Sequence, residues 1–143
     1  MGLPPINCGG IRDPTTQYAI RNAYGKVLDI SQTNPTNAII FDFHGGDNQK
    51  FTITNDGLDF VIKCIQYDGV LEADNAGNVN IGSFTGGSHE KWRIKKVNFV
   101  ENSNLFMIHS SDGINCLDLS KSIDENDNPV INYPCHGTKN QLW

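Results

Sequence analysis

Short runs of alternating apolar and polar residues recur along the chain. Three of them open similar segments: Tyr18-Ala-Ile-Arg, Phe60-Val-Ile-Lys and Phe106-Met-Ile-His. Alternation with a period of two is typical of a strand with one buried face. No window of about 11 residues keeps the 3.6-residue period of a helix. The pattern therefore predicts an all-β chain of short strands.

Each run continues in the same way. Turn dipeptides of the hairpin type follow, at Tyr24-Gly25, Asp68-Gly69 and Asp112-Gly113. A second apolar run comes next, at 27–30, 70–73 and 116–119. A loop rich in Gly, Asn and Asp then leads to a closing tripeptide, Gln49-Lys-Phe51, Glu90-Lys-Trp92 or Gln141-Leu-Trp143. The closing aromatics recur at intervals of about 40–50 residues, which indicates internal repeats.

The repeats predict one domain over residues 1–143, with repeats at about 17–55, 56–101 and 102–143 and an N-terminal arm at 1–16. Propeller blades have a similar period, but propellers need at least about four blades. Three repeats of about four strands each predict a β-trefoil. The acidic insert 122–129 lengthens the third repeat, and we expect it to form an exposed loop.

The three closing tripeptides resemble the Gln-x-Trp pattern of the ricin-B-type (R-type) β-trefoil lectins, most closely the small mushroom members. The resemblance covers residues from about 17 to 143. It implies that Phe51, Trp92 and Trp143 lie in the core, that the Gln or Glu of each tripeptide ties its loop by hydrogen bonds, and that Cys116 pairs with Cys135. It also implies a non-catalytic, cofactor-free lectin with a defensive role, whose partners are glycans on glycoproteins or glycolipids.

Sugar recognition requires a carboxylate acceptor, an amide donor and a flat side chain for the apolar C–H face. The third repeat has Asp118, Tyr133 and Asn140, as in the plant-type galactose site of the family, and its full candidate set is Asp118, Tyr133, His136, Asn140 and Gln141. The first repeat resembles the mushroom version, in which a His and a glycine backbone line the site. Its candidate set is Asp29, Phe41, His44, Gly45, Asn48 and Gln49.

The second repeat departs from this pattern. Glu72 replaces the Asp, Gly82 replaces the aromatic, Thr85 replaces His44 and His89 replaces Asn48. We expect this site to be silent. The two remaining sites predict binding of galactose- or N-acetylgalactosamine-type glycans such as galactose, lactose and N-acetyllactosamine. Whether the chain forms a homodimer stays open.

Composition excludes several other functions. The net charge is −5 and the basic residues are scattered, which disfavours nucleic acid. No apolar run approaches the ~20 residues that a membrane span needs. No signal peptide precedes the repeats, so we expect a cytoplasmic protein, or a secreted one if the sequence is a mature form.

No known catalytic or metal motif emerges. Cys116, Cys135 and His136 do not match the four-ligand spacing of a zinc site. The run 124–128 lacks the central Gly and terminal Glu of an EF-hand. His109, Ser110 and Asp112 lie on one short strand segment and cannot form a triad. We therefore predict neither an enzyme nor a metal site.

Two other functions remain open. One is a β-trefoil protease inhibitor that acts through an exposed loop such as Asp124–Pro129. The other is the sugar-binding module of a larger glycosidase; the start at Met1 and the end at Trp143 favour a complete chain over this alternative.

Overall fold

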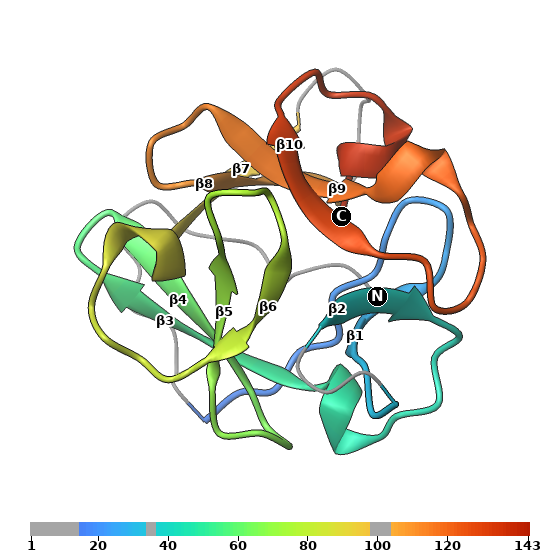
Figure 1. The fold of residues 1–143 in the computed structure, drawn as a ribbon, viewed down its shortest axis with the longest axis horizontal. Helices are drawn as coiled ribbons and strands as arrows, with labels where there is room; N and C mark the ends of the chain where they lie inside the picture. Colours follow the sequence, from blue (N-terminus) through green and yellow to red (C-terminus); the bar gives the residue numbers. More distant parts are fainter. Residues whose placement is uncertain (1–14, 34–36, 98–103) are drawn as a thin grey trace.

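The computed structural model describes residues 15–33, 37–97 and 104–143 (Figure 1). Within them the chain forms ten strands and four single-turn 3-10 helices. The elements are β1 Val27–Ile30, β2 Ala38–Phe41, η1 Asp47–Gln49, β3 Phe51–Asp56, β4 Asp59–Cys64, β5 Val70–Ala73, β6 Val79–Gly82, η2 Ser88–Glu90, β7 Trp92–Lys96, β8 Phe106–Ser110, β9 Asn115–Leu119, η3 Ser120–Ser122, β10 Val130–Pro134 and η4 Lys139–Gln141. In these residues no helix is long and apolar enough to cross a bilayer.

The elements repeat three times. A hairpin, then a 3-10 turn, then a closing aromatic occurs as β1–β2–η1–Phe51, as β5–β6–η2–Trp92 and as β9–β10–η4–Trp143. The hairpins are antiparallel and in the same register, since Asp29 pairs with Ile39, Glu72 with Asn80 and Asp118 with Ile131. The three units form three lobes around a common centre (Figure 1). This is the all-β, three-repeat architecture that the sequence predicts.

The closing aromatics lie in the core. Phe51, Trp92 and Trp143 are fully buried, as predicted. Each indole N–H still has an acceptor: Trp92 Nε1 donates to the Leu71 carbonyl at 2.9 Å, and Trp143 Nε1 donates to the Leu117 carbonyl at 3.1 Å. Burial of these large side chains supplies much of the hydrophobic stabilisation. Because each indole N–H is hydrogen-bonded, no buried donor is left without an acceptor.

Ten described strands replace the twelve expected because two segments pair too briefly to form strands. Tyr18 exchanges two hydrogen bonds with Phe51, at 2.7 and 2.9 Å. Trp143 does the same with Phe106, at 2.6 and 2.8 Å. These bonds close the first and third repeats as ladder bonds would. The expected arm falls almost entirely on residues 1–14, which lie outside the described residues.

Candidate functional site

Asp29 is the buried centre of the first-repeat site. It lies on β1 and is 3% exposed. Its Oδ1 accepts a hydrogen bond from Asn48 Nδ2 at 2.9 Å, and its Oδ2 accepts one from Gln49 Nε2 at 2.8 Å. Burial raises the pKa of Asp29 above its ordinary 3.8, against the opposing effect of these donors and of His44. The carboxylate is thus held in one orientation at the edge of a hollow of about 160 Å³.

Two rings stand beside this carboxylate. Phe41 ends β2, and its ring meets that of His44 edge to face, with centroids 5.9 Å apart and planes at 69°. His44 Nε2 lies 3.7 Å from Asp29 Oδ2, while its Nδ1 accepts from the Gly46 N–H at 3.0 Å. The hollow therefore combines an acceptor, a ring nitrogen and apolar ring surface.

Gln49 connects the loop to the strand. Its carbonyl oxygen accepts from the backbone N–H groups of His44 and Gly45, at 2.9 and 3.2 Å, while its amide donates to Asp29. Gln49 is fully buried. It therefore positions the Asp29 carboxylate and the loop relative to each other, and Gly45 takes part through its backbone N–H. The expected loop-tying role of this residue is confirmed.

The third repeat builds a second site of the same design. Asp118 is 2% exposed, accepts from Gln141 Nε2 at 2.9 Å and lies 3.5 Å from His136 Nε2. Burial again raises its pKa. Tyr133 and His136 meet edge to face at 6.2 Å and 69°, and Gln141 accepts from the N–H groups of His136 and Gly137. The hollow here is larger, about 400 Å³.

Asn48 and Asn140 differ in the hydrogen bonding of their side-chain oxygen. Asn48 Nδ2 donates to both Asp29 and the Ile30 carbonyl, but its buried Oδ1 has no hydrogen-bond partner. Asn140 Oδ1 accepts from Thr138 Oγ1 at 2.8 Å. Gly46 occupies the position of Thr138 in the first repeat, which leaves the Asn48 oxygen free. From the sequence, Asn48 is expected to donate to a ligand; in the structure its amide donates to Asp29 and to the Ile30 carbonyl, and its unpartnered oxygen is buried.

The insert of the third repeat contributes to the first-repeat site. Asp127 lines the hollow beside Asp29. The loop is tied to the first repeat, because Asp127 N–H donates to the Ile40 carbonyl at 3.0 Å and Asn126 Oδ1 accepts from Asp42 N–H at 2.9 Å. Asp127 is absent from the candidate residues predicted from the sequence, since no local pattern shows that this exposed loop reaches a different repeat.

The second repeat lacks the ring and the short carboxylate. Glu72 Oε2 lies 3.3 Å from His89 Nε2, and a Cβ atom at Gly82 would meet Glu72 Oε1 at 2.3 Å. The longer carboxylate thus fills the space where the aromatic ring stands in the other repeats.

Glu90, in the place of Gln49, accepts hydrogen bonds from Thr85 and Gly86. These bonds outweigh burial, which alone would raise its pKa, and hold that pKa below its usual value.

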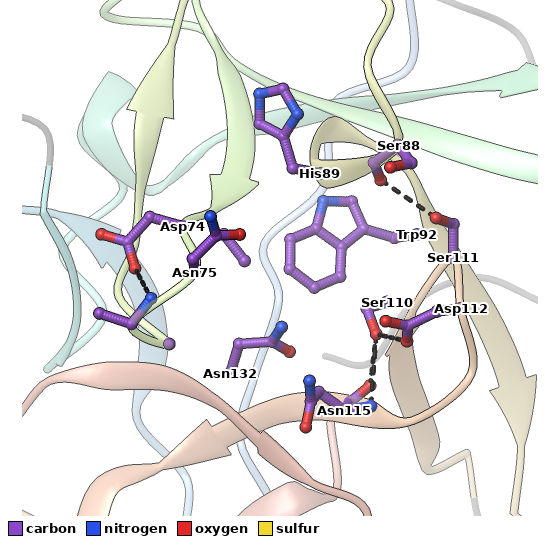
Figure 2. A pocket seen from close by; sticks show the side chains of 13 residues that line it. Asp74, Asn75, Ser88, His89, Trp92, Ser110, Ser111, Asp112, Asn115 and Asn132 are labelled. Carbon is purple, nitrogen blue, oxygen red and sulfur yellow. Dashed lines mark hydrogen bonds between the residues drawn. The ribbon is translucent and has the colours of Figure 1, made fainter.

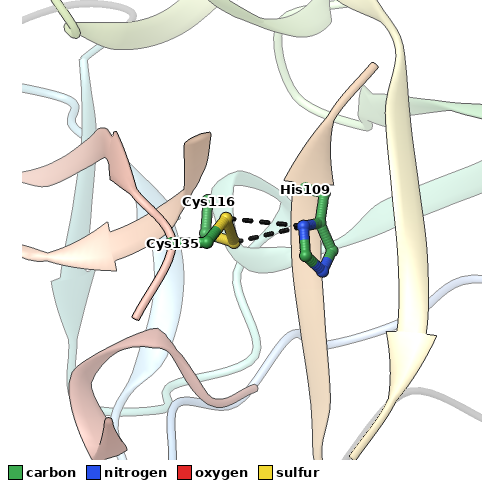
Figure 3. Close-up of side chains that lie close together, drawn as sticks. All are labelled: His109, Cys116 and Cys135. Atoms are coloured by element: carbon green, nitrogen blue, oxygen red, sulfur yellow. Dashed lines mark hydrogen bonds between the residues drawn. A yellow bond between two sulfur atoms is a disulfide. The ribbon is translucent and has the colours of Figure 1, made fainter. Parts of the chain in front are cut away.

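A disulfide joins Cys116 and Cys135 across the third repeat, as the resemblance implied (Figure 3). His109 Nδ1 lies 3.5 and 3.4 Å from the two sulfur atoms. Burial lowers the pKa of His109, and the Lys95 charge adds to this. The histidine beside the cysteines is therefore His109 and not His136. The two sulfur atoms are bonded to each other, so neither is a thiolate that could bind a metal ion.

Residues 16–143 match the model of the ricin-type β-trefoil lectin domain, and the chain belongs to this family of carbohydrate-binding domains. No curated protein sequence matches the chain. The β-trefoil prediction is confirmed.

Several solved structures share the fold. ThreeFoil, a designed threefold-symmetric protein, is 25% identical with a TM-score of 0.76, and the match covers 89% of this chain and 93% of that one. The Rhizoctonia solani agglutinin is 27% identical with a TM-score of 0.71, over 96% and 95%. The Macrolepiota procera ricin B-like lectin, solved in complex with lactose, is 22% identical with a TM-score of 0.81, over 92% and 95%.

Proposed function

We propose that the first- and third-repeat sites bind terminal galactose or N-acetylgalactosamine of glycans on glycoproteins or glycolipids, and that the second repeat is silent. The observation that carries this proposal is the repetition of one arrangement in two repeats: a buried, fixed carboxylate beside an edge-to-face pair of rings. The carboxylate would accept from neighbouring sugar hydroxyls, and the ring surface would receive the C–H face.

Two related structures support this ligand class. The Macrolepiota procera lectin was solved with lactose, and the C-half of the earthworm R-type lectin, which is 23% identical, was solved with N-acetylgalactosamine. Shallow, half-open hollows favour weak binding of one sugar, and a millimolar constant corresponds to only about −4 kcal/mol. Two sites on one chain would then strengthen binding to multivalent glycan surfaces. Such surfaces fit the defensive role that we propose from the likeness to mushroom lectins.

A glycan array with the unaltered protein, Asp29→Ala, Asp118→Ala and the double variant tests the proposal. Each single variant should weaken binding to terminal galactose or N-acetylgalactosamine, and the double variant should abolish it. Asp56→Ala, which removes a partly exposed carboxylate at a hairpin end, is the matched control. If the unaltered protein binds no such glycan, or the double variant binds as well as the control, the proposal is wrong. Inhibition of papain and trypsin would then be measured.

Buried aspartates also support folding, so a second pair of variants keeps the test informative. His44→Ala and His136→Ala remove side chains that are 46% and 38% exposed. We expect both variants to keep the circular dichroism spectrum and thermal midpoint of the unaltered protein while losing affinity for lactose. Unchanged affinity in both would contradict the assignment of these sites.

A further inference from the structure

A polar groove lies between the second and third repeats, outside both proposed galactose sites (Figure 2). Its volume, about 680 Å³, exceeds that of either site. Two hydrogen bonds between repeats brace its walls: Asn132 N–H donates to the Gly77 carbonyl at 2.9 Å, and Ser111 Oγ donates to the Ser88 carbonyl at 3.1 Å. The buried indole of Trp92 forms part of its floor.

Asn132 departs from the internal symmetry of the fold. It pairs with Leu117 in the β9–β10 hairpin, where the other hairpins pair Leu71 with Ile81 and Leu28 with Ile40. Both isoleucines are buried. Asn132 instead places a side-chain oxygen at this position, and that oxygen is buried without a hydrogen-bond partner. A buried polar atom without a hydrogen-bond partner destabilises the fold, and an isoleucine at this position would avoid that cost. The asparagine is explained if a ligand supplies the missing donor.

Two more amides face the same groove. Across the part of the chain that the structure describes, the side chains of Asn75 and Asn115 make no hydrogen bonds, and both line the groove with Asn132 (Figure 2). Asn75 comes from a turn of the second repeat, and Asn115 is the first residue of β9 in the third repeat. Three amides that can each donate and accept therefore surround one space, an arrangement that suits a ligand with many hydroxyl groups.

The charge of the lining narrows the ligand class. Asp74 and Asp112 contribute carboxylates, and among the described residues that line the groove His89 is the only one whose side chain can become a cation. Phosphate, sulfate or sialic acid would meet this negative charge without a compensating arginine or lysine. The polar walls likewise disfavour an apolar ligand. A neutral saccharide meets neither obstacle.

We infer that this groove is a further binding site, for a neutral oligosaccharide. The inference rests on the proposed function only in taking the ligand to be a glycan. The site is separate from the third-repeat site, because alternate residues of a strand face opposite sides: Asn132 faces the groove, while Ile131 and Tyr133 line the third-repeat hollow.

Asn132→Ile tests the inference, since it restores the residue type of the other repeats. The probes are cellotetraose, chitotetraose and mannotetraose, which are neutral and do not end in galactose, with lactose as a separate ligand. We expect the unaltered protein to bind at least one tetrasaccharide, with chemical-shift changes at the side-chain amides of Asn115 and Asn132. Asn132→Ile should weaken that binding at least about tenfold. Lactose affinity and the thermal midpoint should not fall.

Asn80→Ile is the matched control. Asn80 also carries a buried oxygen without a partner, and it stands where the other hairpins have Ile39 and Ile131, but it does not line the groove. It should leave tetrasaccharide binding unchanged. The inference is overturned if no tetrasaccharide binds at about 10 mM, if Asn132→Ile binds as tightly as Asn80→Ile, or if Asn132→Ile simply unfolds. Lactose binding tests the proposed function separately from the groove. It should be lost in Asp29→Ala/Asp118→Ala, whatever the result with the tetrasaccharides.

Discussion

The side-chain amide of Gln49 donates to Oδ2 of Asp29 at 2.8 Å, while its oxygen holds two backbone N–H groups of the loop that carries His44. Gln141 and Asp118 repeat this relationship at 2.9 Å. In the first and third repeats the closing tripeptide is therefore a connector. Its aromatic residue packs in the core, and its glutamine fixes the carboxylate and the loop relative to each other.

Removing this connector should destabilise the protein. Gln49→Ala leaves the His44 and Gly45 N–H groups without their acceptor and removes the donor to Asp29 Oδ2, so we expect the free energy of unfolding to fall by about 2–3 kcal/mol. Urea denaturation monitored by circular dichroism measures this change. Gln66→Ala, at an exposed glutamine, should stay within about 0.5 kcal/mol of the unaltered protein. Equal effects in the two variants would rule out the connector role.

Glycan binding should weaken at mildly acidic pH. Burial raises the pKa of both Asp29 and Asp118 above 3.8. A sugar hydroxyl donates best to the ionised carboxylate, so lactose affinity should fall as the pH decreases through these raised pKa values, beginning above pH 3.8. Lactose titrations from pH 7 to about pH 4 measure the profile. Constant affinity across this range would show that neither carboxylate is needed in its ionised form.

Unfolding does not account for that loss. A carboxyl group whose pKa is raised in the folded state stabilises the protein below its unfolded pKa of 3.8, and this stabilisation is lost as the pH rises through the folded pKa. Acidification therefore does not destabilise the protein through Asp29 or Asp118. Asp42 and Asp74 have lowered pKa values, held down by hydrogen bonds from Lys26 and Asn78 respectively. Their stabilisation is present above 3.8 and is lost only below that pH. Glu90, whose pKa is lowered from a usual value of 4.5, begins to lose its stabilisation below that pH. The circular dichroism spectrum should therefore stay constant down to about pH 4.5 while affinity declines.

The parts of the molecule that repeat could be predicted from the sequence. Phe51, Trp92 and Trp143 each close a repeat and share one buried environment, so three weak signals reinforce each other. The equivalent places of these residues in the repeats also predicted that Asp29 lies near Asn48, and Asp118 near Asn140.

Contacts that break the symmetry could not be predicted in this way. Asp127 comes from a loop of the third repeat but lines the first-repeat hollow. Asn132 is an ordinary strand residue in the sequence, and only the paired register shows that it replaces a buried isoleucine. Long-range packing decides both positions, and no local period encodes it.

The contribution of Asp127 can be measured through Asp29. Asp127 is a like charge near Asp29 and helps to raise its pKa. Asp127→Asn removes the charge and suits the positive φ of 72° at this position, which asparagine tolerates. In an Asp118→Ala background, where only the first site reports, we expect the acid midpoint of lactose binding to move to lower pH. Asp124→Asn, in the same loop but outside the hollow, should leave the midpoint unchanged.

The second repeat should become able to bind a sugar only if several positions change together. Gly82→Phe alone forces its Cβ against the Glu72 carboxylate, whose Oε1 would lie only 2.3 Å from that Cβ, so we expect the free energy of unfolding to fall by about 1–3 kcal/mol. Glu72→Asp withdraws the carboxylate by one methylene. The pair should therefore cost less than the sum of the single changes, by at least about 0.5 kcal/mol in a double-mutant cycle.

Adding Thr85→His, His89→Asn and Glu90→Gln to this pair copies the remaining first-repeat residues onto a backbone that already shares their register. Placed in the Asp29→Ala/Asp118→Ala background, the fivefold change should create lactose binding where none remains, with an affinity near that of the first-repeat site. Lactose titration by calorimetry measures the gain, and the same background without the five changes is the control. Strictly additive costs of Gly82→Phe and Glu72→Asp would mean that Glu72 does not fill the place of the missing ring. Full stability without any lactose binding would mean that carboxylate, ring, histidine, asparagine and glutamine are not sufficient for the site, and that neighbours such as Asp127 are required.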